Sequence, residues 1–192
     1  GLEILAGLHQ VKLNTLCKEF FQEEIHFDEL IPLTNYLGIS KIHLINAVFK
    51  LLGLSRSLDK LKRFTINSID YEDGINADFD LINGASLLES IAINLDHNKE
   101  NSLTNISSIN KLVGLKSLVI DMNGIEEESN DIKKIFHPLV NLEYLSIKNW
   151  PFINLEPLSK NKNLKYLSIS YGNLEKVVGI NKLVSLRKVH FL

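Results

Sequence analysis

The sequence predicts an α/β solenoid, in which one short strand from each repeat joins a parallel sheet and the rest of the repeat returns over the other side. Three stretches of the form L-x-x-L-x-L, with Ile, Val and Phe accepted in place of Leu, begin at Leu142, Leu164 and Leu186, 22 residues apart. The segments that lead into two of the strands also repeat, because residues 109–115 (INKLVGL) and 180–186 (INKLVSL) differ at one position. Self-similarity at a fixed period of this length is typical of a solenoid.

The same pattern extends the prediction to about eight repeats in a single domain, residues 1–192. The repeats begin near Leu8, Ile39, Leu61, Leu88, Leu115, Leu142, Leu164 and Leu186. The spacings between these starts are 31, 22, 27, 27, 27, 22 and 22 residues. The first residues fit the middle of a repeat and no polar capping repeat follows the last strand, so we expect the chain to be a fragment of a longer protein.

Each repeat is expected to alternate between the interior and the solvent. Positions one, four and six of the pattern are apolar and should point inward, while positions two, three, five, seven and eight face outward. The repeats of 22 residues have room only for 3₁₀ turns or extended returns, whereas the longer ones can hold helices. We expect helices at residues 29–36, at 77–83 and from Ser129 or Asn130 to Leu139, where Ile132, Ile135 and Phe136 complete a helical apolar stripe.

With repeats of 20 to 29 residues that begin L-x-x-L-x-L, the chain resembles the leucine-rich-repeat family over essentially its whole length. The resemblance implies a right-handed, horseshoe-shaped solenoid with a concave parallel sheet and a convex side of helices and 3₁₀ turns. The family usually has Asn at the ninth position, which here holds Leu16, Ala47, Ile69, Asp96, Asn123, Trp150 and Gly172. This irregularity, with mixed 22- and 27-residue repeats, resembles bacterial intracellular and effector-like members more than the regular extracellular ones.

The composition limits the cell compartments and the classes of partner that we expect for this chain. The formal net charge of −2 and the pI near 6.3 provide no field that would gather nucleic acid or an anionic membrane. A membrane span of about 18 consecutive apolar residues is absent from the sequence, and no signal peptide is visible. Cys17 is the one cysteine, which fits a reducing compartment. We therefore expect a cytoplasmic protein, or an effector secreted into the cytosol of a host cell.

Chemistry-bearing motifs are missing, so we expect neither an enzyme nor a cofactor or metal site. The sequence contains no Gly-rich phosphate loop, no C-x-x-C pair and no H-E-x-x-H. Cys17 and His26 could form a thiol nucleophile with its base, but a small buried residue suits the position of Cys17, and packing is the favoured interpretation. The six histidines are too scattered to suggest metal binding.

The outward strand positions instead predict a protein-binding surface. The candidate residues lie toward the C-terminal end of the chain: Tyr144, Tyr166, Tyr171, Lys148, Trp150, Val119 and Met122. Exposed Tyr and Trp beside an apolar patch are the usual anchors of protein interfaces. Eight strands about 4.8 Å apart would make a face roughly 34 Å wide, which is too open for a small-molecule substrate.

The predicted function is therefore recognition of a partner protein, either from a host or from the same bacterium. Two alternatives stay open. The chain could be the targeting portion of a larger enzyme, such as an effector ubiquitin ligase. It could also bind nucleic acid through basic residues of its N-terminal third, which are Lys12, Lys41, His43, Lys62 and Arg63. The overall charge of −2 argues against nucleic acid.

Overall fold

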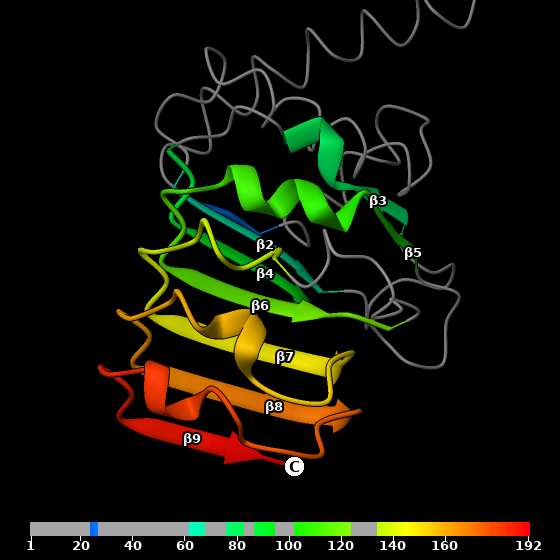
Figure 1. The fold of residues 1–192 in the computed structure, drawn as a ribbon. Coiled ribbons are helices and arrows are strands. Elements are labelled where there is room, and N and C mark those ends of the chain that lie inside the picture. Colours follow the sequence, from blue (N-terminus) through cyan, green and yellow to red (C-terminus); the bar gives the residue numbers. More distant parts are fainter. Residues whose placement is uncertain (1–23, 27–61, 68–75, 83–86, 95–101, 124–133) are drawn as a thin grey trace, which may run out of the picture.

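The computed structural model describes residues 24–26, 62–67, 76–82, 87–94, 102–123 and 134–192. Seven parallel strands of this part of the chain form one sheet, in the order β1-β2-β4-β6-β7-β8-β9 (Figure 1). The strands are β1 (Glu24–His26), β2 (Arg63–Asn67), β4 (Ser90–Asn94), β6 (Ser117–Asp121), β7 (Tyr144–Trp150), β8 (Tyr166–Gly172) and β9 (Lys188–Phe191). Neighbours in the sheet follow one another along the chain, as a solenoid requires.

The register of the sheet follows the repeat pattern of the sequence. From β2 to β7 the paired residues are 27 positions apart, as in the series Arg63, Ser90, Ser117 and Tyr144. From β7 to β9 they are 22 positions apart, as in the series Tyr144, Tyr166 and Lys188. The third position of each repeat therefore lies directly beside the third position of the next.

The strand beside β2 differs from the one that the repeat pattern predicts. The pattern suggests a strand that follows Ile39, but β2 pairs with β1, where Glu24 lies beside Arg63. The segment Glu24–His26 (EIH) lacks the leucines by which the pattern was found. The repeats that were expected to begin at Leu8 and Ile39, and the helix expected at residues 29–36, lie outside the described residues.

The predicted alternation between interior and solvent is confirmed in β4, β6, β7 and β8. The first, fourth and sixth positions of these repeats are at most 2% exposed. They are Leu88, Ile91 and Ile93; Leu115, Leu118 and Ile120; Leu142, Leu145 and Ile147; and Leu164, Leu167 and Ile169. The residues between the inward side chains of each strand are half-buried or exposed. These leucines and isoleucines thus form a continuous core on one side of the sheet.

The other layer of the solenoid is made of short elements that lie on one side of the sheet (Figure 1). They are the 3₁₀ helices η2 (Phe79–Ile82), η3 (Ile106–Lys111), η4 (Glu156–Leu158) and η5 (Ile180–Lys182), with a small parallel sheet of β3 (Asn76–Asp78) and β5 (Ser102–Thr104). The opposite side of the seven-stranded sheet is called the open face below.

Two helix predictions fail where the structure can test them. The helix predicted at residues 77–83 is replaced by the end of β3 and by η2, so the chain there is extended and then makes a 3₁₀ turn. In the predicted helix that ends at Leu139, residues 134–138 form turns, and the preceding residues 124–133 lie outside the described ranges. Ile135, Phe136 and Leu139 are nevertheless buried. The apolar stripe predicted burial correctly, although it did not determine the backbone conformation.

Asparagine side chains join neighbouring repeats on the side of the 3₁₀ helices. The Asn141 amide donates to the backbone carbonyl of Val113 over 2.9 Å, and the Asn163 amide donates to Val140 over 2.8 Å. The fully buried amide of Asn161 donates to the carbonyls of Phe136 (2.9 Å) and Leu139 (2.8 Å). The carbonyls of Phe136 and Leu139 also accept backbone N–H groups, so Asn161 provides each of them with a second donor and links the two repeats.

Candidate protein-binding surface

Two tyrosines form a stack on the open face. Tyr144 of β7 and Tyr166 of β8 are direct strand neighbours, and their ring centroids are 4.4 Å apart with an interplanar angle of 1°. The tyrosine stack is defined as these two residues. Tyr166 also approaches His190 of β9, with ring centroids 5.9 Å apart. Partial burial, and then the neighbouring Tyr166, raise the pKa of Tyr144, so its hydroxyl stays protonated at neutral pH.

Tyr171 is more exposed than the stack and lies at the other end of β8. Its side chain has an exposed fraction of 66%, against 37% for Tyr144. Five residues separate Tyr171 from Tyr166, which corresponds to about 16 Å along a strand. The backbone of Tyr171 is left-handed, with φ of 61°, and its N–H donates to the carbonyl of Leu192 over 2.9 Å. The sequence grouped the three tyrosines, but the structure brings only two of them together.

Charged side chains border the tyrosine stack. Lys188 of β9 is the strand neighbour of Tyr166, and the exposed Arg187 precedes it. Lys148 is half-buried and lies four residues beyond Tyr144 in β7. Within the same repeats, Lys165 forms an ion pair with Glu143, with 2.6 Å between Nζ and Oε2. This hydrogen bond lowers the pKa of Glu143.

Val119 lies where the sequence predicts, on the open face beside the stack. It is half-buried in β6, between Ala92 of β4 and Ser146 of β7. The neighbouring outward residues Ser90 and Ser117 are also small. The surface beside Tyr144 therefore carries short side chains on two successive strands, so that Tyr144 is the first large side chain along this row of third positions after Arg63.

Two predicted surface residues, Trp150 and Met122, are buried instead. Trp150 is 0% exposed, its Nε1 donates to the carbonyl of Asn154 over 3.1 Å, and its ring contacts Phe136 and Phe152 at centroid distances of 5.8 and 5.0 Å. Met122 is 1% exposed. Neither side chain can meet a partner without unfolding, so both are removed from the candidate surface.

The cause of these errors is the geometry at the strand ends. The residue before Trp150, Asn149, has φ of 55°, which rotates the following side chain out of the regular alternation. Met122 follows the last residue of β6, and the preceding Asp121 is buried as well, so alternation has already stopped there. The burial of Trp150 could have been expected from its place at the ninth position of the repeat. In the family that the chain resembles, the side chain at this position usually makes contacts inside the solenoid.

The structure leaves the other chemical candidates untested. Cys17, Lys12, Lys41 and His43 lie outside the described residues. Lys62 directly precedes β2 and Arg63 is its first residue, and each of them has an interaction partner. In the described ranges, no group of three His, Cys, Asp or Glu side chains is arranged to hold a metal ion. None of the helices in those ranges is long and apolar enough to cross a membrane.

Comparison with known proteins identifies the fold. No protein-family model matches the chain, and no curated protein matches it. Among solved structures, an internalin (InlF) of Listeria monocytogenes matches with 19% sequence identity and a TM-score of 0.54, covering 72% of this chain and 37% of the internalin. Internalin C2 of the same species matches with 16% identity and a TM-score of 0.34, covering 71% of this chain and 74% of that protein.

The similarity to InlF establishes the architecture. Internalins are leucine-rich-repeat proteins, and the parallel sheet with few helices agrees with that architecture. The chain therefore has a leucine-rich-repeat fold. It spans little more than a third of the length of InlF, with 37% covered.

Proposed function

We propose that this chain is a protein-interaction module whose open face binds a partner protein, with the tyrosine stack at the centre of the contact. The observation that carries the proposal is the parallel pair Tyr144 and Tyr166 on a rigid sheet, with rings 4.4 Å apart and Tyr144 37% exposed. Tyrosine offers a large contact area with few rotatable bonds and keeps a hydroxyl for polar contacts. Ordering such a surface on binding costs little, because the rings are already held in place.

The proposal includes the small side chains beside the stack and the lysine beyond it. Val119 would provide an apolar floor, and Lys148 and Tyr171 would lie at the edge of the contact. The leucine-rich-repeat fold, which is typical of interaction modules, supports a protein as the partner. We further propose an effector-like protein that acts in the cytoplasm or, after secretion, in a host cell. The single cysteine of the chain supports a reducing compartment.

Site-specific crosslinking tests the proposal. A photo-reactive phenylalanine analogue is placed at Ser168, two residues after Tyr166 in β8 and between Ser146 of β7 and His190 of β9. The matched control carries it at the exposed Lys182 on η5. Both variants of the full chain are illuminated in extracts of the source cells and of host cells. We expect a crosslinked protein at Ser168, and we expect Tyr166→Ala to abolish it while Lys182→Ala leaves it in place.

Binding measurements then show how much Tyr166 contributes to the affinity for the partner. Once the crosslinked protein is purified, Tyr166→Ala should weaken its binding by about 2 kcal/mol or more, as truncation of a central aromatic anchor does. The melting temperature should stay nearly unchanged, because the ring lies on the surface. Crosslinks that arise only from η5, or that survive Tyr166→Ala, would place the binding surface elsewhere.

A further inference from the structure

The open face of the last three strands carries a charge opposite to that of the whole chain. The chain has a formal net charge of −2. The outward positions of β7, β8 and β9, together with the residues just before these strands, contain four basic residues and one acidic residue. The basic residues are Lys148, Lys165, Arg187 and Lys188, and the acidic residue is Glu143.

Within the described residues, only one of these basic side chains has an ion-pair partner. Lys165 is paired with Glu143 at 2.6 Å. For Lys148, Arg187 and Lys188, the described part of the chain provides no carboxylate within ion-pair distance. These three residues are called the basic border. Their charges remain available to a ligand that lies on the face.

The basic border surrounds the tyrosine stack on two sides. Lys188 lies beside Tyr166 on the next strand, and Arg187 precedes it at the start of β9. Lys148 lies on the same strand as Tyr144, about 13 Å further along at the usual rise per residue. A ligand centred on the two rings would therefore have Lys188 beside it and Lys148 further along the strand direction. It would meet no unpaired negative charge from these three repeats.

We infer that the partner presents an acidic protein segment, in which an apolar or aromatic side chain packs against the tyrosine stack and flanking Asp or Glu side chains meet the basic border. This inference rests on the proposed function, since it names the partner chemistry for the same surface. Complementary charge around an apolar centre adds specificity and speeds association. Nucleic acid fits less well, because three unpaired cations on an acidic chain provide little of the extended positive field that a phosphate backbone requires.

Selection from displayed libraries tests the inference without a known partner. The full chain is used to select binders from random peptides and from a folded helical scaffold with a randomised surface. We expect recovered sequences enriched in Asp and Glu around a central apolar residue. Their affinity should fall at least about fivefold from low to high salt, because screening weakens exposed charge pairs.

Charge-reversal variants separate the open face from general basicity. Lys188→Glu should weaken the acidic binders about tenfold or more, since like charges placed together oppose binding. Lys182→Glu changes the net charge by the same amount on η5 and should leave the affinity within about twofold, because a charge change outside the contact acts only through a screened field. Far-ultraviolet circular dichroism and the melting temperature confirm that both variants fold.

The outcomes distinguish the inference from the proposed function. Binders that depend on Tyr166 but are neutral, and that tolerate Lys188→Glu, would overturn the acidic segment and leave the proposed function standing. Binders that tolerate Tyr166→Ala, or the recovery of no binder from either library, would overturn both. A single-stranded oligonucleotide that binds more tightly than the acidic binders, and loses affinity with Lys188→Glu, would also overturn the acidic protein segment.

Discussion

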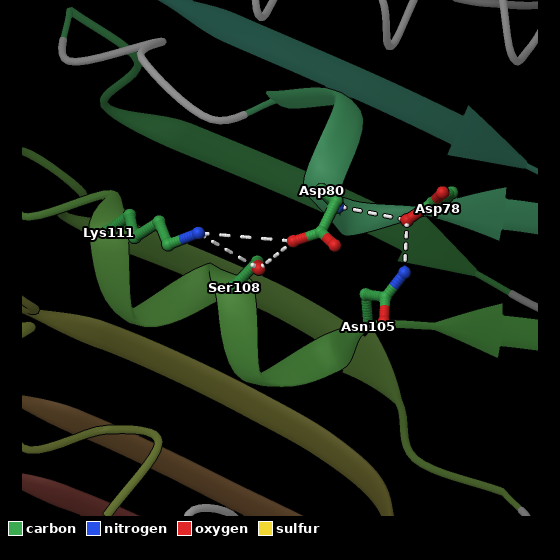
Figure 2. Close-up of polar contacts among 5 residues, drawn as sticks. All are labelled: Asp78, Asp80, Asn105, Ser108 and Lys111. Atoms are coloured by element: carbon green, nitrogen blue, oxygen red, sulfur yellow. Dashed lines mark hydrogen bonds and ion pairs between the residues drawn. The ribbon is translucent and has the colours of Figure 1, made fainter.

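The repeats with 27-residue spacing and those with 22-residue spacing share one sheet but connect differently on its other side. Between β2 and β6, the longer repeats add the small β3–β5 sheet and the 3₁₀ helices η2 and η3 (Figure 1). Charged and polar side chains join these elements in a network of Asp78, Asp80, Asn105, Ser108 and Lys111, shown in Figure 2. From β7 onward, the connections between strands consist of turns and the short 3₁₀ helices η4 and η5, and buried side chains such as Asn161 make the polar contacts.

The two kinds of repeat therefore differ in how much each polar contact should matter. In the network of the longer repeats, the side chains of Lys111 and Asp80 are 52% and 50% exposed, and water can replace their contacts. In the shorter repeats, Asn161 and Trp150 are fully buried, so water cannot replace the hydrogen bonds that their side chains donate. We therefore expect the loss of a buried contact in the shorter repeats to destabilise the chain more than the loss of an exposed contact in the longer ones.

Removing Trp150 should have the largest effect. Trp150→Ala deletes a fully buried ring that contacts Phe136 and Phe152, and it leaves a cavity where the first shorter repeat packs against the last longer one. We expect a loss of about 3–5 kcal/mol in the free energy of unfolding, measured by urea denaturation. Ser146→Ala on the open face of the same strand is the control and should change it by no more than about 0.5 kcal/mol. Similar values for the two would contradict the assignment of Trp150 to the core.

Gly172→Ala should be the next most damaging change. Gly172 is paired with Trp150, has φ of 101°, and a Cβ there would lie 2.3 Å from the Trp150 carbonyl oxygen. The left-handed backbone alone should cost about 1–3 kcal/mol, and the clash adds to it. The matched substitution Ser170→Ala, two residues earlier in β8, should be nearly neutral in thermal melts. If both variants melt alike, the two strands do not approach each other so closely.

Asn161→Ala tests the buried polar contacts of the shorter repeats. It would remove the side-chain donor from the carbonyls of Phe136 and Leu139, each of which would keep only its backbone donor. We expect a loss of about 1–3 kcal/mol in the free energy of unfolding. Asn163→Ala should reduce the free energy of unfolding less, because Asn163 is exposed and its amide donates one bond, to Val140. A larger effect for Asn163→Ala would reverse our ranking of buried over exposed amides.

Asp80→Ala tests the exposed network of the longer repeats. The variant loses the ion pair with Lys111, which spans 3.9 Å, and the contact with Ser108. Since exposed ion pairs contribute little, we expect about 0–1 kcal/mol, and a smaller difference still at high salt. If chemical denaturation showed a greater loss than for Asn161→Ala, the contrast between the two kinds of repeat would be reversed.

The pH dependence should show the smallest effect, through His137. Partial burial, followed by the positive charge of Lys160, lowers the pKa of His137 below its ordinary value of 6.5. The unfolded chain therefore binds this proton more readily, so stability is full above pH 6.5 and falls as the pH drops through the lower, folded pKa. His137→Asn should reduce the loss of stability between pH 7 and pH 5. An unchanged or steeper loss would contradict the direction of the shift.

The sequence was sufficient to predict β4, β6, β7 and β8 because inward apolar residues recur at alternate positions in the body of each strand. Leu118, Leu145 and Leu167 must be buried, and a shift by one residue would expose every one of them. The adjacency of Tyr144 and Tyr166 followed from the same 22-residue period. By contrast, β1, β3 and β5 are three residues each and have no apolar pattern, since backbone pairing alone defines them.

The errors at the candidate surface came from backbone conformation that the pattern does not encode. The left-handed residue Asn149 turns Trp150 inward, and a regular pleat cannot predict that change. The third-position tyrosines lie well within the strands, where alternation holds, so their outward placement was correct. The contact between Tyr166 and His190 was missed, although both residues occupy outward positions on neighbouring strands.

The burial of the single tryptophan also makes it a natural optical probe. Trp150 is the one Trp in the chain, and its indole lies against Phe136 and Phe152 without solvent contact. Its fluorescence therefore reports on the junction of β6, β7 and β8, whereas far-ultraviolet circular dichroism averages over all repeats. In solenoids each repeat touches only its neighbours, so distant repeats can unfold separately. Comparing the two signals during denaturation shows whether the short repeats separate from the long ones before the chain unfolds as a whole.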